Sequence, residues 1–214
     1  QQLLEDDPKK PSILPIFVGS AEVFNRIHIP GSVHISPAQL VCGVAPANGK
    51  IADLDDLSLV FNSIGLSPDH VVIAYDDEGG GWAGRFIWLL DEIGHSNYSY
   101  LNGGLPAWSA AGLPLEKGLY SHPESQIIVK NYAKNTLTAD DLIESLNTHS
   151  LQIWDARSPM EYRGETINAA KGGHIPGALN YEWTQAMDHS KNLRLKPLEH
   201  ILKELQTLGI SADK

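Results

Sequence analysis

The tetrapeptide His28-Ile29-Pro30-Gly31 recurs 146 residues later as His174-Ile175-Pro176-Gly177. A second pair of similar segments follows in the same order: IGLSPD at 64–69 and LGISAD at 208–213, which are 144 residues apart. Two landmarks in one order at nearly one spacing are the signature of an internal repeat. The 214 residues therefore predict two copies of one structural module.

The first copy alternates strand and helix signals. The continuous apolar run VVIAY at 71–75 is typical of a strand buried on both faces of a parallel sheet, and the loop DDEGGG at 76–81 follows it. Apolar residues then recur at helical spacing over 82–93, before Gly94. The same reasoning predicts strands at 13–18 and 98–101 and helices at 54–64 and 103–111. This alternation predicts an α/β fold with a parallel sheet flanked by helices.

The second copy is shorter. It predicts a helix capped by Thr138 with Leu142, Ile143 and Leu146 inward, a strand over 151–154, and a helix over 197–208 that Gly209 ends. Residues 114–135 have weak periodicity and contain prolines, as linkers do. We therefore expect a first module over 1–113, a linker over 114–135, and a second module over 136–214 that is incomplete at its C-terminus.

Composition limits the partners. The net charge is −10, divided into −8 over residues 1–120 and −2 over 121–214. This acidity disfavours nucleic acid and anionic membranes as partners, and the second half repels a small anion less. We expect a cytoplasmic protein, because no signal peptide or transmembrane run is visible. The oligomeric state is left open. The single cysteine, Cys42, excludes an internal disulfide framework.

Three motifs together resemble the tandem-domain rhodanese family of thiosulfate and 3-mercaptopyruvate sulfurtransferases. They are the repeated His-Ile-Pro-Gly, the stretch NGGLPAW at 102–108, and WDARSPMEY at 154–162 followed by GGHIPGA at 172–178. The resemblance implies two rhodanese-like modules. It also implies sulfur transfer without a cofactor, in which a loop cysteine takes sulfur from a small anionic donor as a persulfide and passes it to a thiophilic acceptor such as cyanide.

The position that corresponds to the family's nucleophile in the first module is Asp76, which cannot carry a persulfide. The first module of such proteins is typically inactive, so the resemblance implies that the nucleophile belongs to the second module. The repeat offset places it about six residues past Lys214, so we expect this chain alone to be inactive. A non-catalytic binding protein of the same fold, and a phosphatase, remain alternatives that the residues past Lys214 would decide.

Several other residues are candidates for the site. Arg163 and Lys171 are the candidates to meet the anionic donor, with an ordinary surface role as the alternative for each. Trp82 is a candidate wall of the second module's site, with the alternative that it is the first core residue of its helix. We expect Asp155 and Arg157 to form a structural pair, and His28 and His174 to make structural hydrogen bonds. Glu161 stands where many mercaptopyruvate-type members have arginine, which favours thiosulfate.

The remaining motifs have plainer interpretations. Cys42 is interpreted as a buried or incidental thiol. Gly79-Gly80-Gly81-Trp82-Ala83-Gly84 matches a dinucleotide-binding pattern, but the three acids before it favour a tight glycine loop. The cluster Asp76-Asp77-Glu78 is interpreted as a solvated acidic loop rather than a metal site.

Overall fold

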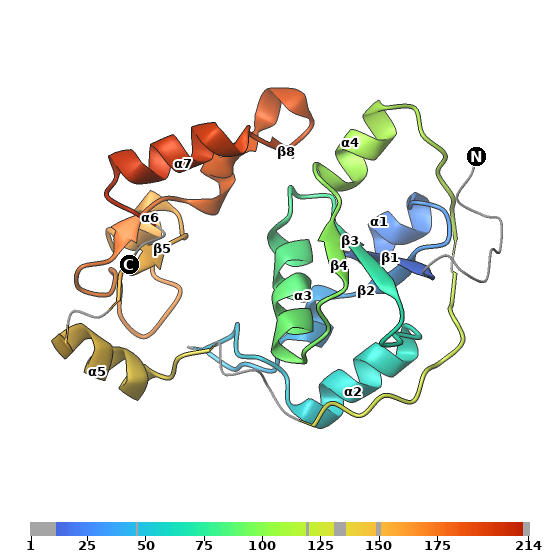
Figure 1. Cartoon of the computed structure of the whole chain (residues 1–214), viewed down its shortest axis with the longest axis horizontal. Coiled ribbons are helices and arrows are strands. Elements are labelled where there is room, and N and C mark those ends of the chain that lie inside the picture. Colours follow the sequence, from blue (N-terminus) through green and yellow to red (C-terminus); the bar gives the residue numbers. More distant parts are fainter. Residues whose placement is uncertain (1–11, 46, 119, 131–135, 149–150, 212–214) are drawn as a thin grey trace.

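The computed structural model describes residues 12–45, 47–118, 120–130, 136–148 and 151–211. In the first half, four parallel strands form one sheet in the order β2-β1-β3-β4 (Figure 1). These strands are β1 (Ile13–Val18), β2 (Val33–Ile35), β3 (Val71–Tyr75) and β4 (Tyr98–Tyr100). The predicted strand over 71–75 is confirmed, and it lies next to β1 inside the sheet because its apolar side chains are covered on both faces.

Helices cover both faces of this sheet. The helices of the first half are α1 (Ala21–Arg26), the short 3-10 helix η1 (Pro37–Leu40), α2 (Leu54–Ser63), α3 (Gly81–Glu92) and α4 (Gly104–Ala110). One core cluster contains Phe61 of α2 and Phe86 of α3, and a second contains Phe24 of α1 and Leu105 of α4. The first half is thus a three-layer α/β unit, as predicted.

The second half has less regular structure. Its helices are α5 (Ala139–Thr148), α6 (Pro159–Tyr162), η2 (Trp183–Ala186), η3 (His189–Lys191) and α7 (Leu198–Thr207). Strand β5 (Trp154–Asp155) pairs in parallel with β6 (Leu179–Asn180), and β7 (Met187–Asp188) forms an antiparallel hairpin with β8 (Arg194–Leu195). Figure 1 shows this half beside the first, with α7 at its outer edge.

The strand registers confirm that the two halves repeat one unit. Ile16 of β1 pairs with Val33 of β2, and Trp154 of β5 pairs with Leu179 of β6. The side chains one position further along also make matching bonds. His34 Nε2 lies 2.8 Å from the carbonyl oxygen of Gly19, and Asn180 Nδ2 donates to the carbonyl oxygen of Arg157 over 2.8 Å. The similarity between the two halves therefore extends to individual hydrogen bonds.

The histidine of each His-Ile-Pro-Gly copy has the same structural role. The His28 ring stacks on Phe24 with centroids 4.0 Å apart, and its Nδ1 lies 2.8 Å from the Phe24 carbonyl oxygen. The His174 ring stacks on Tyr162 at 3.6 Å, and its Nδ1 lies 2.7 Å from the Tyr162 carbonyl oxygen. Each histidine thereby fastens the turn to the short helix before it, as the sequence predicted.

These two histidines differ in burial, which makes them a matched pair for mutation. His28 is 1% exposed, whereas His174 lies at the surface. His28→Ala is expected to cost about 2–4 kcal/mol, because it removes a hydrogen bond and leaves a cavity. His174→Ala is expected to cost about 0.5–1.5 kcal/mol, the value of an aromatic pair. Urea unfolding of the two variants checks this, and an equal loss in both would contradict it.

Some second-half expectations are wrong in detail. The strand predicted over 151–154 is only Trp154–Asp155, and Ile143, predicted inward, is exposed on α5. The helical periodicity also predicts Leu198, Leu202 and Leu208 inward, but Leu198 and Leu202 of α7 and Leu208 directly after it are exposed. The cause is visible in the sheets: among the described residues β5 has a partner strand on one side only, so these apolar faces have no layer to pack against.

The segment between the halves lies along the first one. Asn62 of α2 accepts a hydrogen bond from the Ile127 amide (2.7 Å) and donates one to the Ile127 carbonyl (3.0 Å), and Val129 is buried in the first core cluster. The module boundaries at 113 and 136 stay a prediction. No described helix has the length and apolarity needed to cross a membrane.

Candidate functional site: the loop after β3

Asp76, the residue at the expected nucleophile position, is fully buried at the end of β3. Its carboxylate accepts five backbone N–H bonds from the loop and from the first turn of α3. Oδ1 accepts from Glu78, Gly79 and Gly80 at 3.2, 3.1 and 2.8 Å, and Oδ2 accepts from Trp82 and Ala83 at 3.1 and 3.0 Å. The loop is therefore an anion-binding nest whose anion is the protein's own side chain. The prediction of a solvated acidic loop is wrong for Asp76.

Glycines allow this closure. Gly79 and Gly80 have φ values of +98° and +108°, in the left-handed region that a Cβ disfavours. Gly104 at the start of α4 has φ +51°, and a Cβ there would collide with the backbone oxygen of Asp76. The close approach lets Leu105 N–H donate to that oxygen over 2.9 Å. The glycine pattern after the strand is thus the tight loop that the sequence favoured over a dinucleotide site.

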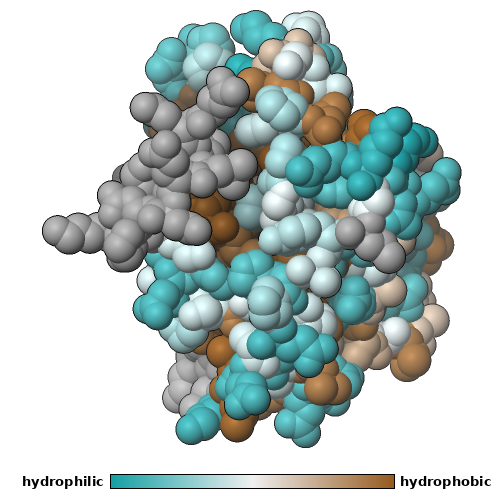
Figure 2. Space-filling view, turned by 90° about the vertical axis from the view of Figure 1, so that its right-hand side faces the viewer, coloured by the Kyte–Doolittle hydropathy of each residue, from teal (hydrophilic) through white to brown (hydrophobic). Residues whose placement is uncertain are grey.

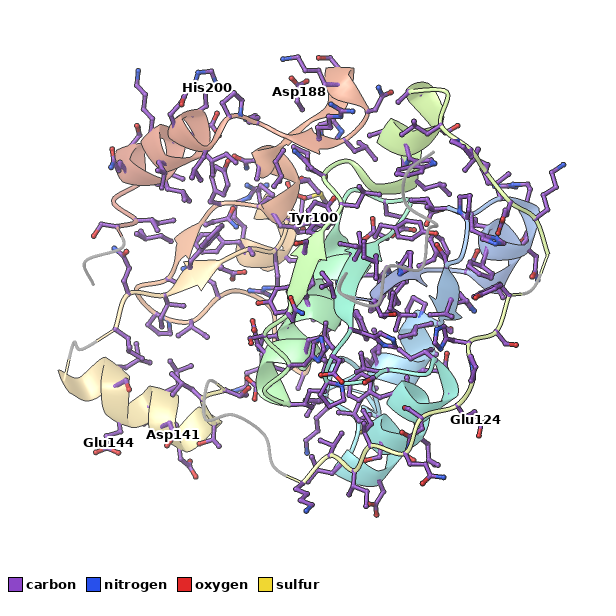
Figure 3. The ribbon with its side chains drawn as sticks, turned by 45° about the vertical axis from the view of Figure 1, so that its right-hand side comes forward. Tyr100, Glu124, Asp141, Glu144, Asp188 and His200 are labelled. Atoms are coloured by element: carbon purple, nitrogen blue, oxygen red, sulfur yellow. The ribbon has the colours of Figure 1, made fainter. Side chains whose placement is uncertain are left out.

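Two tyrosines flank the loop. Burial raises the pKa of Tyr75 to about 12, while its hydroxyl accepts from Ile29 N–H and donates to Ser32 Oγ at 2.7 Å. Burial, and then the nearby Asp76 charge, raise the pKa of Tyr100 to about 12. In Figure 3, Tyr100 lies where the two halves meet. Both tyrosines are therefore neutral near pH 7.

Asp77 points away from the nest. It lines a shallow depression of about 390 Å³ together with Arg26 of α1 and Leu105 and Ser109 of α4. Burial raises the pKa of Asp77, and the charge of Arg26 acts in the opposite direction. Glu78 is exposed. The three acids therefore point to different surroundings, and no group of three metal-ligating side chains is found among the residues the structure describes.

In the second half, Asp155 and Arg157 form the predicted structural pair. Arg157 Nη2 lies 2.6 Å from Asp155 Oδ2 and donates to the Gly173 carbonyl at 3.0 Å. The hydrogen bond from Arg157 is the main reason the pKa of Asp155 is lowered. The pair joins the end of β5 to the glycines before the second His-Ile-Pro-Gly turn.

The predicted donor-binding residues are not gathered at one place. Arg163 is exposed and pairs with Glu165 at 2.7 Å, and Lys171 is exposed on the connection that follows. Trp82 belongs to the first half, where it packs against the core cluster around Phe61 and Phe86. Arg163 and Lys171 thus share one connection between α6 and the second turn, while Trp82 lies on α3.

Glu161 is held by its neighbours. Its carboxylate accepts from Ser158 Oγ (2.9 Å) and from Asn168 Nδ2 (2.9 Å), and these hydrogen bonds, that of Asn168 first, lower its pKa. Glu161 therefore caps α6 and braces the connection that carries Lys171.

Sequence reasoning missed the residues that join the halves. A Cβ at Gly79 would collide with Met187 of β7, and one at Gly81 would lie 3.1 Å from the Trp183 ring of η2. Asn102 Oδ1 accepts from Leu195 N–H over 2.7 Å. Nothing in the sequence marks Met187 or Trp183 as partners of a glycine loop, because the contact is made to backbone.

Cys42 lies outside this loop. It is exposed, and its Sγ donates to the Ile51 carbonyl oxygen at 2.9 Å. The part of the prediction that makes this thiol buried is wrong, because Cys42 lies on a surface loop closed by the Val41–Ile51 bridge. Figure 2 shows one face of the molecule, on which hydrophilic and hydrophobic residues are mixed.

Comparison with known proteins agrees with this architecture. The family model for the rhodanese-like domain matches residues 3–111 and again 138–214. A thiosulfate sulfurtransferase of Azotobacter vinelandii is 46% identical over 204 residues, which are 95% of this chain and 74% of the relative. A thiosulfate sulfurtransferase of Pseudomonas aeruginosa is 41% identical over the same shares.

A solved structure gives the same answer. The crystal structure of SseA, a 3-mercaptopyruvate sulfotransferase of Escherichia coli, superposes with a TM-score of 0.85 at 26% identity, covering 95% of this chain and 80% of SseA. The two matched segments, the 46% identity and the shared fold are sufficient evidence of common descent. The chain belongs to the rhodanese-like domain family.

Proposed function

We propose that this protein is a sulfurtransferase that moves a sulfane sulfur from thiosulfate to a thiophilic acceptor such as cyanide. A cysteine thiolate attacks the outer sulfur of thiosulfate, a new S–S bond forms, and sulfite leaves with the electron pair of the broken S–S bond. The acceptor then attacks the outer persulfide sulfur, which yields thiocyanate from cyanide and regenerates the thiolate. The reaction balances without a cofactor.

We also propose that the protein is located in the cytoplasm.

The observation that carries the proposal is the nest around Asp76. Five N–H groups converge on two oxygen atoms of one anion. A thiolate or persulfide at the corresponding position of a second such loop would be stabilised by the equivalent N–H groups of that loop. A nest at a helix N-terminus favours negative charge whatever atom carries it. The high identity to thiosulfate sulfurtransferases supports thiosulfate as the donor.

The nucleophile is assigned to the second module. Asp76 follows the strand that pairs with β1, and β5 is the counterpart of β1. On this proposal the matching strand pairs with the other side of β5, and the residue that corresponds to Asp76 is a cysteine a few residues past Lys214. On this proposal Cys42 has no catalytic role, since it lies on a first-half loop between η1 and α2.

Lys171 and Arg163 are proposed to attract the donor to this second loop. Arg163 already pairs with Glu165, which leaves Lys171 as the stronger candidate. In a gene product that extends past Lys214, Lys171→Met is expected to raise the KM for thiosulfate about 3–10-fold with kcat unchanged, because a charge near the entrance contributes about 1 kcal/mol of attraction. Lys203→Met, on the far helix α7, is the control. Equal KM values for the two variants would remove Lys171 from the site.

Trp82 is proposed as an apolar wall of the second module's site, and the same assay tests this with Trp82→Leu.

The function itself is tested by thiocyanate formation from thiosulfate and cyanide. The extended gene product is expected to turn over, and its variant lacking the cysteine past Lys214 is expected to be inactive.

A non-catalytic binding protein of this fold is the other candidate, favoured by the carboxylate that occupies the first-module nest. An extended product with a folded second loop and no cysteine would establish that alternative.

A further inference from the structure

The loop after β3 is covered by the second half of the chain. Met187 of β7 is 4% exposed and lies on Gly79, the Trp183 ring lies on Gly81, and Leu193 also approaches Gly79. The outer side of the loop that surrounds Asp76 therefore faces the second half of the chain. Residues 79–81 form one contact segment of the interface between the halves.

A second contact segment lies beside the first. Asn102 Oδ1 holds the Leu195 amide at 2.7 Å, and Gly103 lies against Arg194 and the Asn192 carbonyl oxygen. All three residues belong to the β7–β8 hairpin, which Figure 1 shows between α7 and α4. The hairpin thus rests on two segments, 79–81 and 102–104, that are separated in sequence.

Asp76 lies between these two segments and holds both. Its carboxylate accepts the N–H groups of Gly79 and Gly80, and its backbone oxygen accepts the N–H of Leu105, directly after Gly104. The contact surface at 79–81 is glycine backbone, which has no side chains of its own to fix its shape. The anion beneath it is what fixes it.

We propose that residues 76–83 and 102–104 form a docking platform for the β7–β8 hairpin, and that the Asp76 carboxylate is the internal anion that keeps this platform in shape. The first-module loop has an interface role in place of a nucleophilic one. This inference does not depend on sulfur transfer, since it concerns contacts within residues 76–195.

The test uses the 214-residue chain with Cys42→Ser and Met187→Cys, so that the rate of thiol labelling reports how often the hairpin lifts. Adding Asp76→Gly removes the acceptor of five N–H groups, two of them in buried hydrogen bonds and three in half-buried ones. Labelling is expected to accelerate at least about tenfold, which corresponds to about 1.4 kcal/mol. Sodium formate supplies a carboxylate that fits the space left by the side chain, and it is expected to return the rate toward that of the parent. Formamide and sodium chloride at the same concentration are expected not to.

Asp53→Gly is the matched control, because Asp53 caps α2 of the same half through the Asp56 N–H and does not face the hairpin. It is expected to leave the labelling rate unchanged. If Asp76→Gly does not fold, Asp76→Asn keeps the shape and removes the charge, and is expected to label faster without a response to formate. Labelling of Asp76→Gly at the parent rate overturns the proposal, and so does an acceleration that formate fails to reverse.

Discussion

Gly104→Ala is expected to destabilise the first half by about 2–5 kcal/mol. A left-handed φ of +51° costs an alanine about 1–2 kcal/mol, and the collision of its Cβ with the Asp76 carbonyl oxygen adds about 1–3 kcal/mol of overpacking. The colliding atom belongs to backbone that is anchored by Leu105 N–H, so it cannot move aside at low cost. Urea unfolding followed by tryptophan fluorescence measures the loss.

Gly112→Ala is the control at the other end of the same helix. Gly112 also has a left-handed φ, +66°, but a Cβ there meets nothing within 4 Å. It should lose only the conformational contribution of about 1–2 kcal/mol. Equal losses at Gly104 and Gly112 would show that the close approach of α4 to Asp76 has no energetic weight.

In a gene product that continues past Lys214, the backbone amides of β5 and α7 are expected to be strongly protected from hydrogen exchange, because the apolar side chains of these elements are covered. Corresponding positions differ sharply between the halves: Ile16 is 0% exposed and Trp154 is 45% exposed, while Ile64 is 3% exposed and Leu208 is 43% exposed. In the first half these positions are covered by β3 and α3. A matching strand and helix would bury this apolar surface, and each Å² removed from water would stabilise the fold by about 25 cal/mol.

Hydrogen exchange measures this protection. Amides of β5 and α7 are expected to exchange at least about a hundredfold more slowly in the extended product than in residues 1–214, whereas β1 and β3 are expected to change little. The first half is the internal control, since its sheet is already four-stranded. Equal exchange of β5 in both proteins would mean that no further strand pairs with it.

Local patterns predicted the first half well. The strand over 71–75 has the predicted bounds, because an unbroken apolar run between polar residues admits one buried strand. The repeated His-Ile-Pro-Gly predicted the repeated turn, and the structure adds the aromatic stack that makes histidine useful there. The second half was predicted less well, since Ile143 and Leu202 carry helical periodicity but lack the layer that would cover them.

The sequence predicted which residue follows β3, but not how that residue is held. The end of β3 marked Asp76, but its five N–H donors come from a loop whose path depends on two left-handed glycines. Sequence reasoning treated all three acids as loop charge, whereas one is buried as the loop's own ligand. The contact of Met187 with Gly79 joins residues more than a hundred positions apart through backbone, and no residue pattern encodes such a contact.

The central proposal is that the second module carries sulfur on a cysteine at the position that corresponds to Asp76. The most direct measurement is the mass of the extended gene product after incubation with thiosulfate, followed by peptide mapping. The proposal predicts one added sulfur atom on the loop cysteine past Lys214, removed by cyanide with release of thiocyanate, and none on Cys42. A protein whose mass does not change, or whose added sulfur is on Cys42, would contradict it.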